Sequence, residues 1–336
     1  MRTGYAFLAA LSLSLTPCAR ASFYLQDEWI GEEFYQAWNW ETENDPTHGR
    51  VNYVSQAEAL GKNLTYVDGN GAFVMRADDW SIVDPAARGR DSIRISSQSA
   101  YEEAIFVLDL KHMPAGCSTW PAFWTLSKAG PWPNGGEIDI IEGVNLGTHN
   151  QATLHTTPNC TMPPDWWREP QTGKTADSNC DTAANFNTGC GVIFTDPLPS
   201  CTSYGAPFNR AGGGYFVMYK GRDSVKVWFY PRVGYVPKVI RDGAGRGQRV
   251  RPDFTWGLPA ANFPFFPDHC NYDQHFDAHQ IVFDLTFCGD WAGSDGIWPT
   301  SGCGTGTCPD FVNNNPSAFA EAYWEINSLR VYTSQW

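Results

Sequence analysis

Three acidic residues lie within six positions of a strongly β-forming segment, residues 137–142, whose sequence is EIDIIE. In a regular strand Glu137 and Asp139 share a face, whereas Glu142 falls on the opposite face and would enter the core. An unpaired carboxylate in the core is costly. We therefore predict a β-bulge between Asp139 and Glu142, because one extra residue returns all three acids to the same face.

Acids arranged in this way can hydrolyse a glycosidic bond. With the bulge, the Cα atoms of Glu137 and Glu142 lie about 13 Å apart by strand rise. On a concave sheet their side chains can lean together towards the carboxyl separation of roughly 5 to 5.5 Å that retaining glycosidases use. Asp139 lies between them, and its charge raises the proton affinity of its neighbours. The ordinary alternative, judged from alternation alone, is the polar face of an exposed strand.

Aromatic residues around this strand favour the chemical interpretation. The chain contains 15 Trp, although charged residues make up only 18% of it, and Trp120, Trp124 and Trp132 all lie within twenty residues before Glu137. Sugar sites combine carboxylates with indole rings, since the C–H faces of a pyranose stack on aromatic rings while its hydroxyls bind polar neighbours. The pattern therefore predicts a carbohydrate site.

The segment GGEIDIIEG, with TWPAFW at 119–124 and WPN at 132–134 before it, resembles the active-site strand of family 16 glycoside hydrolases. It has the E-x-D-x-x-E form of the laminarinase-type members, which hydrolyse β-1,3- and β-1,3-1,4-glucans. The resemblance to fungal secreted endo-1,3(4)-β-glucanases covers residues 23–332. It is carried by the segments HGRVNY at 48–53, HMP at 112–114, TLHT at 153–156, FCGDW at 287–291, NNNPS at 313–317 and LRVY at 329–332.

The resemblance implies a concanavalin A-like β-jelly roll, in which two antiparallel sheets form a sandwich with an open cleft on the concave face. It also implies roles for individual residues. Glu137 is then the nucleophile, Glu142 the general acid and base, and Asp139 the hydrogen-bonding partner of Glu137. Trp120 belongs to the same stretch, but core packing is at least as good an explanation for it. Substrate-binding roles are implied for His155, Trp124, Trp132, Trp291, Asn52, Tyr53 and Arg94.

The residue pattern agrees with an all-β fold. Apolar and polar residues alternate with a period of two, as in half-buried strands. The predicted strands are 92–96, 104–110, 137–142, 152–156, 215–219, 225–230, 281–287 and 329–332. Residues 221–224 (GRDS) predict a hairpin loop. The one predicted helix is short, with Ser317 as N-cap before residues 318–322.

The organisation of the chain favours one domain. Its 32 Gly and 23 Pro predict many turns and few long helices. Short strands without βαβ alternation indicate a sandwich or barrel rather than an α/β fold. No linker, low-complexity tract or internal repeat divides the sequence, so we expect a single catalytic domain over residues 22–336.

The first 21 residues resemble a secretory signal. Arg2 precedes an apolar run at 5–15, and Ala19-Arg20-Ala21 fits the A-x-A cleavage pattern. The run is too short to span a bilayer. We therefore expect cleavage after Ala21 and an extracellular protein, in which the sequons at Asn63 and Asn159 are glycosylation sites.

Cysteine usage also suits an oxidising compartment. Ten Cys residues are present, and Cys18 is lost with the signal. The nine that remain form at most four disulfides and leave one thiol over. Cys303 and Cys308, across a Gly-rich loop, are the most local candidate pair. Cys201 is the cysteine that does not fit the family pattern.

Charge and composition exclude some partners. With 23 Lys plus Arg against 36 Asp plus Glu, the net charge of −13 disfavours a nucleic-acid partner. Residues 268–279 hold three His and three Asp, but no recognised metal spacing, and the Arg residues at 241–251 suit a solvated loop. The C-terminus VYTSQW has no hydrophobic tail, so we expect no lipid anchor. We expect a monomer with a β-glucan substrate and no metal or other cofactor.

The family resemblance, together with the residue pattern, implies a secreted, endo-acting, retaining hydrolase of β-1,3- and mixed-linkage β-1,3(1,4)-glucans. Two alternatives remain open at this point. A β-glucan transglycosylase uses the same nucleophile but passes the glycosyl unit to a sugar. A non-catalytic β-glucan-binding protein keeps the aromatic cleft, although the presence of both Glu137 and Glu142 argues against it.

Overall fold

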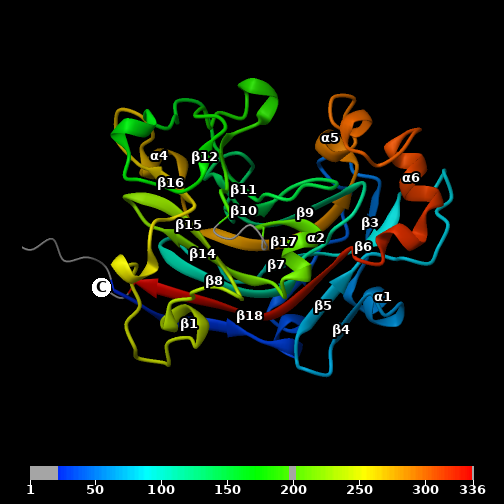
Figure 1. The fold of residues 1–336 in the computed structure, drawn as a ribbon, viewed down its shortest axis with the longest axis horizontal. Helices are drawn as coiled ribbons and strands as arrows, with labels where there is room; N and C mark the ends of the chain where they lie inside the picture. Colours follow the sequence, from blue (N-terminus) through cyan, green and yellow to red (C-terminus); the bar gives the residue numbers. More distant parts are fainter. Residues whose placement is uncertain (1–21, 197–201, 335–336) are drawn as a thin grey trace, which may run out of the picture.

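The computed structural model describes residues 22–196 and 202–334, and two large antiparallel sheets pack face to face in it (Figure 1). The predicted signal at 1–21 and Cys201 lie outside the described residues. The predicted two-sheet antiparallel sandwich is confirmed. Among the described residues, no helix has both the length and the apolar character that a membrane crossing requires.

The first sheet forms the lower layer in Figure 1 and has the strand order β16-β15-β14-β8-β18-β5-β4, with β1 also paired to β18. Its strands are β1 (Phe23–Trp29), β4 (Thr65–Val67), β5 (Phe73–Arg76), β8 (Ala104–His112), β14 (Gly214–Lys220), β15 (Ser224–Pro231), β16 (Ala261–Pro264) and β18 (Tyr323–Ser334).

The second sheet lies above the first and has the order β12-β13-β11-β10-β9-β17-β7-β2. Its strands are β2 (Trp38–Trp40), β7 (Arg94–Ser97), β9 (Thr119–Ser127), β10 (Glu137–Glu142), β11 (Gln151–His155), β12 (Lys174–Thr175), β13 (Cys190–Ile193) and β17 (His279–Phe287). A separate parallel pair joins β3 (Val51–Tyr53) to β6 (Arg90–Ser92).

Helices are short and lie in the connections between strands, as the Gly and Pro content predicts. The α-helices of the described chain are α1 (Gln56–Gly61), α2 (Gly205–Arg210), α3 (Lys238–Arg241), α4 (Tyr272–His275), α5 (Gly289–Ala292) and α6 (Cys308–Asn314). The 3-10 helices are η1 (Gly31–Tyr35), η2 (Asp165–Trp167), η3 (Asn185–Asn187), η4 (Phe254–Trp256), η5 (Trp298–Thr300) and η6 (Pro316–Phe319).

Strand β8 shows how the sequence pattern determines the layers. Phe106 and Leu108 belong to the core between the two sheets. Ile105 and Val107 belong to a second cluster on the outer face of the first sheet, with residues that include Ile240 from the segment after β15. Because both faces of β8 are covered, it is apolar almost throughout.

All eight predicted strand segments lie in strands of the structure, with ends that shift by a few residues, although 92–96 is divided between β6 and β7. The predicted hairpin loop joins β14 to β15. The helix prediction is wrong in detail. Ser317 lies inside η6, whose N-cap is Asn315, because Pro316 occupies the first helical position and starts the turn earlier.

The predicted Cys303–Cys308 pair is wrong. Cys303 bonds Cys117, and Cys308 bonds Cys288. Each of these bridges connects the C-terminal loops to a strand end of the second sheet, which proximity in sequence does not reveal. The other two described bridges are Cys160–Cys270 and Cys180–Cys190.

Candidate active site

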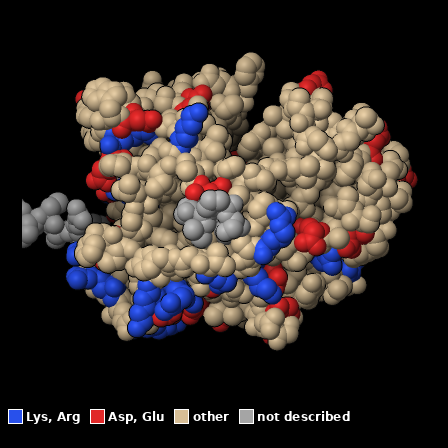
Figure 2. Space-filling model, in the orientation of Figure 1, with Lys and Arg blue, Asp and Glu red and all other residues tan. Residues whose placement is uncertain are grey.

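A cleft of about 810 Å³ lies on the exposed face of the second sheet. Figure 2 shows the surface hollowed between the part over β12 and α4 and the part over α5. Alternate residues of four neighbouring strands line the cleft, since successive side chains of a strand point to opposite faces. They are Trp120, Ala122, Trp124 and Leu126 of β9; Glu137, Asp139 and Glu142 of β10; Gln151 and His155 of β11; and Asp284 and Thr286 of β17.

The predicted β-bulge is present in β10. Asp139 pairs with Trp124 of β9, but the next residue of β9, Phe123, pairs with Ile141, so Ile140 is the extra residue. Ile140 and Ile141 consequently both point into the core, and all three acids of β10 face the cleft. The prediction that the chain corrects the phase of Glu142 is confirmed.

A buried asparagine stabilises this bulge. Asn150, which is fully buried, accepts a hydrogen bond from the Glu142 N–H at 3.0 Å and donates one to the Ile140 carbonyl at 2.7 Å. Bulged residues lose ladder partners, and buried backbone groups need replacements for them. Asn150 supplies both, so it helps to hold Glu142 on the cleft side.

Glu137 accepts a hydrogen bond from the indole N–H of Trp132 at 2.6 Å. Burial raises the pKa of Glu137 to about 7, against the Trp132 hydrogen bond and the positive charge of Arg94, which both lower it. A carboxyl group with this pKa is partly ionised near neutral pH and can act as a nucleophile in its ionised form.

Glu142 has a matching environment at the other end of the strand. Its carboxylate accepts a hydrogen bond from the indole N–H of Trp120 at 2.9 Å, and the Trp120 ring packs edge-on against Trp291. Burial raises the pKa of Glu142 to about 7, and the nearby charge of Glu137 adds to the rise. A carboxyl group that keeps its proton near neutral pH can act as a general acid.

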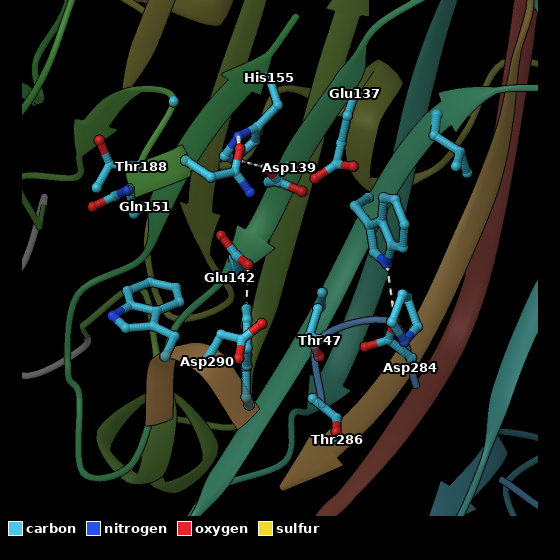
Figure 3. Close-up of a pocket in the computed structure, with 18 of the residues that line it drawn as sticks. Thr47, Glu137, Asp139, Glu142, Gln151, His155, Thr188, Asp284, Thr286 and Asp290 are labelled. Carbon is cyan, nitrogen blue, oxygen red and sulfur yellow. Dashed lines mark hydrogen bonds and ion pairs between the residues drawn. The ribbon is translucent and has the colours of Figure 1, made fainter. Parts of the chain in front are cut away.

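Asp139 lies between Glu137 and His155 in Figure 3. Burial and the charges of Glu142 and Glu137 raise the pKa of Asp139 well above its ordinary value, whereas burial lowers the pKa of His155. Neutral His155 donates from Nδ1 to the Asn187 amide oxygen at 3.1 Å, which leaves Nε2 unprotonated. Nε2 lies 3.4 Å from Asp139 Oδ2, so we assign the proton of this pair to Asp139.

The three ligand atoms of Glu137, Asp139 and His155 also lie within 4.8 Å of one another, a spacing that can hold a metal ion. Carboxylate oxygen and imidazole nitrogen are ordinary ligands for zinc. Such a site would require Asp139 to be ionised, which its raised pKa opposes. The residues therefore fit a proton-sharing cluster better than a cation site.

A second polar cluster forms the adjoining wall of the cleft. Asp284 lies 3.4 Å from the guanidinium of Arg94 and accepts a hydrogen bond from the Trp124 indole at 3.0 Å. Burial raises the pKa of Asp284 to about 7, opposed chiefly by the charge of Arg94. Arg94 is also paired with Glu41 at 2.7 Å and lies over the Trp124 ring. This network fixes the Trp124 ring as a wall against which a sugar can stack.

The loop that carries Trp132 is held from below by the His- and Asp-rich segment of the sequence. His279, fully buried, donates from Nε2 to the Gly135 carbonyl at 2.7 Å and accepts at Nδ1 from Thr125. Gly135 has a φ of +73°, and a Cβ there would lie 2.5 Å from Asp277 and Ser127. The segment thus clamps the residues immediately before Glu137.

Lys220 reinforces the clamp from the first sheet. Its buried ammonium donates to the Asp277 carbonyl at 2.7 Å, the Glu102 carbonyl at 2.6 Å and the Tyr272 hydroxyl at 3.0 Å. Burial lowers the pKa of Lys220 to about 7. The end of the segment, from Asp277 to His279, therefore helps to position the loop before β10.

Most predicted site residues meet at the cleft. Its lining includes Glu137, Asp139, Glu142, Trp124, Trp132, His155, Trp291, Tyr53 and Arg94. Asn52 is not part of the lining, because in β3 it points away from Tyr53 and donates to Asp91 at 2.6 Å. The sequon residues Asn63 and Asn159 are exposed on loops, where glycosylation remains a prediction.

Several residues of the site are not among the predicted ones. Core packing is an equally good expectation for Trp120 from the sequence, yet its indole N–H donates to Glu142 directly. Asp284 and Thr286 lie in the predicted strand at 281–287, and the alternation itself places them opposite Phe283, on the cleft face. That signal was readable. The roles of Asn150 and His279 depend on contacts between distant segments and carried no such signal.

A family model described as "XgeA-like, catalytic GH16 domain" matches residues 38–332. The chain therefore belongs to glycoside hydrolase family 16. The predicted family, the glycosidase class and the jelly-roll fold are confirmed.

Individual relatives agree with this assignment. A structure of GH16 Laminarinase 16A from Phanerochaete chrysosporium, with two β-glucans in its donor and acceptor sites, is 47% identical, covers 93% of this chain and all of its own, and has a TM-score of 0.85. A structure of an elongating GH family 16 β-1,3-glucosyltransferase is 38% identical over the same shares of the two chains, with a TM-score of 0.82.

An endo-1,3(4)-beta-glucanase of Arthroderma benhamiae is 36% identical over 98% of this chain and 68% of its own length. Some relatives are longer. One from Aspergillus niger is 40% identical over 96% of this chain, which spans only 42% of that relative.

Proposed function

We propose that this protein is a secreted, endo-acting, retaining glycoside hydrolase of β-1,3- and mixed-linkage β-1,3(1,4)-glucans. One observation carries the proposal: three acids of β10 face an aromatic-lined cleft, and the two Glu residues have a raised pKa of about 7. Four described disulfides support an extracellular location.

In the first step, ionised Glu137 attacks the anomeric carbon of the sugar on the donor side. The bond to the glycosidic oxygen breaks as Glu142 gives its proton to that oxygen, and a glycosyl ester of Glu137 forms. The indole of Trp132 holds Glu137, and that of Trp120 holds Glu142. Neither indole can accept a proton, so neither competes for the one that is transferred.

In the second step, Glu142 acts as a base. It removes a proton from water, the oxygen of that water adds to the anomeric carbon, and the ester bond to Glu137 breaks. Two inversions give net retention. Protonated Asp139 limits the negative charge around ionised Glu137.

The cleft supplies the binding energy that places a glucan over these acids. Trp124 and Trp291 line it with Trp132, and rings of this kind stack on pyranose faces. Arg94, Gln151 and Thr286 add hydrogen-bonding groups on the same surface. A cleft on the open face of a sheet suits an internal stretch of a polymer, which supports endo action.

The test is digestion of linear β-1,3-glucan, mixed-linkage β-1,3-1,4-glucan and β-1,6-branched glucan by the purified protein. Products are sized by mass spectrometry, and their anomeric configuration is followed by NMR. We expect internal cleavage of the first two polymers with initial β-anomers. Initial α-anomers would refute the double-displacement mechanism, and binding without cleavage of any polymer would indicate a glucan-binding protein.

Transglycosylation is the second candidate, favoured by the 38% identical structure of an elongating β-1,3-glucosyltransferase. It shares the glycosyl ester of Glu137, but a sugar hydroxyl takes the place of water. The same product analysis, with a laminari-oligosaccharide as the substrate, distinguishes the two. Products longer than a supplied laminari-oligosaccharide would establish transfer, and shorter products alone would establish hydrolysis.

A further inference from the structure

An exposed group of aromatic rings lies outside the catalytic cleft. Trp166 is 85% exposed, Trp167 53% and Phe266 36%. The Trp167 ring is stacked between the other two, with centroids 6.4 Å from Trp166 and 5.7 Å from Phe266 and interplanar angles of 21° and 12°. His269 supports Trp167 edge-on at 5.1 Å. We call Trp166, Trp167 and Phe266 the aromatic ridge.

The ridge is held in place by its surroundings. The Cys160–Cys270 disulfide links the segments on which the Trp and Phe residues lie. Arg168, next to Trp167, donates to Thr175 Oγ1 at 2.9 Å. These contacts fix the loop that carries Trp166 and Trp167 at both ends. The rings are therefore held in their exposed positions.

The ridge flanks one end of the catalytic cleft. The loop with Trp166 and Trp167 leads into β12, the edge strand of the cleft sheet, and the next residues, Ala176 and Asp177, line the cleft itself. Phe266 follows β16 and precedes α4. Figure 1 shows β12, β16 and α4 side by side in one corner of the molecule. A polymer that leaves the cleft at this edge would meet the ridge.

We propose that the aromatic ridge is a second binding site for a β-glucan chain, separate from the catalytic cleft, and this proposal rests on the proposed function. Trp166 offers a nearly free ring face, on which the apolar face of a pyranose stacks. Two ion pairs lie beside the ridge, Arg168 with Asp165 and Lys226 with Glu169. Exposed aromatic rings that stack on pyranose faces suit a neutral polysaccharide.

The size of the ridge argues against a protein partner. Three aromatic side chains expose at most a few hundred Å², because a whole aromatic side chain buries only about 150–250 Å². A stable protein interface needs roughly 800 Å² on each partner. A sugar ring needs only one indole face, so a glucan is the occupant that fits.

The test compares three proteins, each in the inactive Glu137→Gln background: the otherwise unchanged chain, Trp166→Ala/Trp167→Ala, and Trp80→Ala. Trp80 is a matched control, since it is 52% exposed on a loop far from β12 in the sequence. Binding to insoluble β-1,3-glucan is measured by depletion. We expect the double variant to bind about fivefold to tenfold more weakly, because it lacks two stacking rings. The Trp80→Ala control should bind as tightly as the unchanged chain.

The same substitutions in the active enzyme complete the test. Cleavage of the insoluble glucan should fall about threefold or more, while kcat/KM on a soluble laminari-oligosaccharide stays within about twofold. Equal binding by all three proteins would overturn the proposal. So would an equal loss on both substrates, or dissociation of a dimer by the double variant in sedimentation. Failure of the unsubstituted enzyme to cleave either substrate would instead count against the proposed function.

Discussion

Glu137 and Glu142 have similarly raised pKa values, but different parts of the structure hold their side chains. Each accepts a hydrogen bond from an indole, and each has a pKa raised by burial to about 7. Trp132, however, is 45% exposed on a loop, whereas Trp120 belongs to β9 and packs on Trp291. The indole that binds Glu142 therefore comes from a strand of the sheet, whereas the indole that binds Glu137 comes from a loop.

The two sides are consequently stabilised by different buried residues. Asn150 satisfies the backbone of the bulge next to Glu142, and His279 holds the loop before Glu137 through the Gly135 carbonyl. Both residues are buried, and each contacts β10 or the loop before it through backbone groups only. We infer that the two ends of the catalytic strand are aligned independently.

The largest expected effect comes from removing either carboxylate. Glu137→Gln should lower kcat by at least about 10⁴-fold, because no ester can form, and Glu142→Gln by about 10²- to 10⁴-fold on unactivated glucan. With an activated aryl glucoside, which needs little acid assistance, Glu142→Gln should recover much of its first step as a burst of aryl alcohol. Single-turnover and steady-state assays check this difference. Equal losses of Glu142→Gln on glucan and on the aryl glucoside would contradict the role of Glu142 as the general acid.

Stability provides the folding control for Glu137→Gln. Burial raises the pKa of Glu137 in the folded protein to about 7, above an ordinary value of 4.5. The folded state therefore binds more protons than the unfolded state between these values, and stability is lost as the pH rises through this range. Gln removes the loss, so the variant should melt at a higher temperature than the parent at pH 8 and lose this advantage near pH 4.5.

Much of this site could be predicted from the sequence, for a physical reason. Glu142 is out of phase with Asp139, and a buried acid is too costly, so the bulge followed from six residues. Strand β9 was not among the predicted strands. It contains Pro121, which cannot donate to a ladder, yet the strand pairs with both β10 and β17. The disulfide partners and the Asn150 and His279 contacts arise only when distant segments pack together.

The next effects separate the two supports. His279→Leu leaves the buried Gly135 carbonyl without its donor, which costs about 1–3 kcal/mol, and should lower kcat about 10- to 100-fold. His279→Gln can restore the donor and should recover part of that loss. Steady-state kinetics on soluble β-1,3-glucan measure both variants, with melting temperature as the control. Equal kcat in the Leu and Gln variants at equal stability would show that the Gly135 hydrogen bond does not position Glu137.

Asn150→Ala tests the opposite end of β10. Loss of its two hydrogen bonds to the bulge should displace Glu142 and lower kcat by a similar factor, about 10- to 100-fold. The activated aryl glucoside distinguishes the two ends, because its first step needs Glu137 but little help from Glu142. Asn150→Ala should therefore retain most of that step, and His279→Leu should not. The reverse result would contradict the independent alignment of the two ends.

Smaller shifts are expected in the pH dependence. Activity should rise as Glu137 ionises and fall as Glu142 loses its proton, giving a bell. Each indole hydrogen bond lowers the pKa of its carboxyl group. Trp132→Phe should therefore move the acidic limb up by about one pH unit, and Trp120→Phe should move the alkaline limb up by a similar amount. Profiles of kcat/KM check this, and movement of the same limb in both variants would contradict the assignment of acid and nucleophile.

The smallest expected effect concerns metal ions at Glu137, Asp139 and His155. Dialysis against EDTA should change kcat by less than about twofold, because the proposed reaction uses these residues as proton and nucleophile groups. Added Zn²⁺ should inhibit, since binding it would take up the lone pairs of Glu137 that attack the sugar and displace the proton of Asp139. His155→Gln should weaken that inhibition. If EDTA abolished activity and Zn²⁺ restored it, this cluster would instead be a catalytic metal site. Glu137 would then be a metal ligand, and its comparison with Glu142 as a second proton-transfer or nucleophilic group would no longer hold.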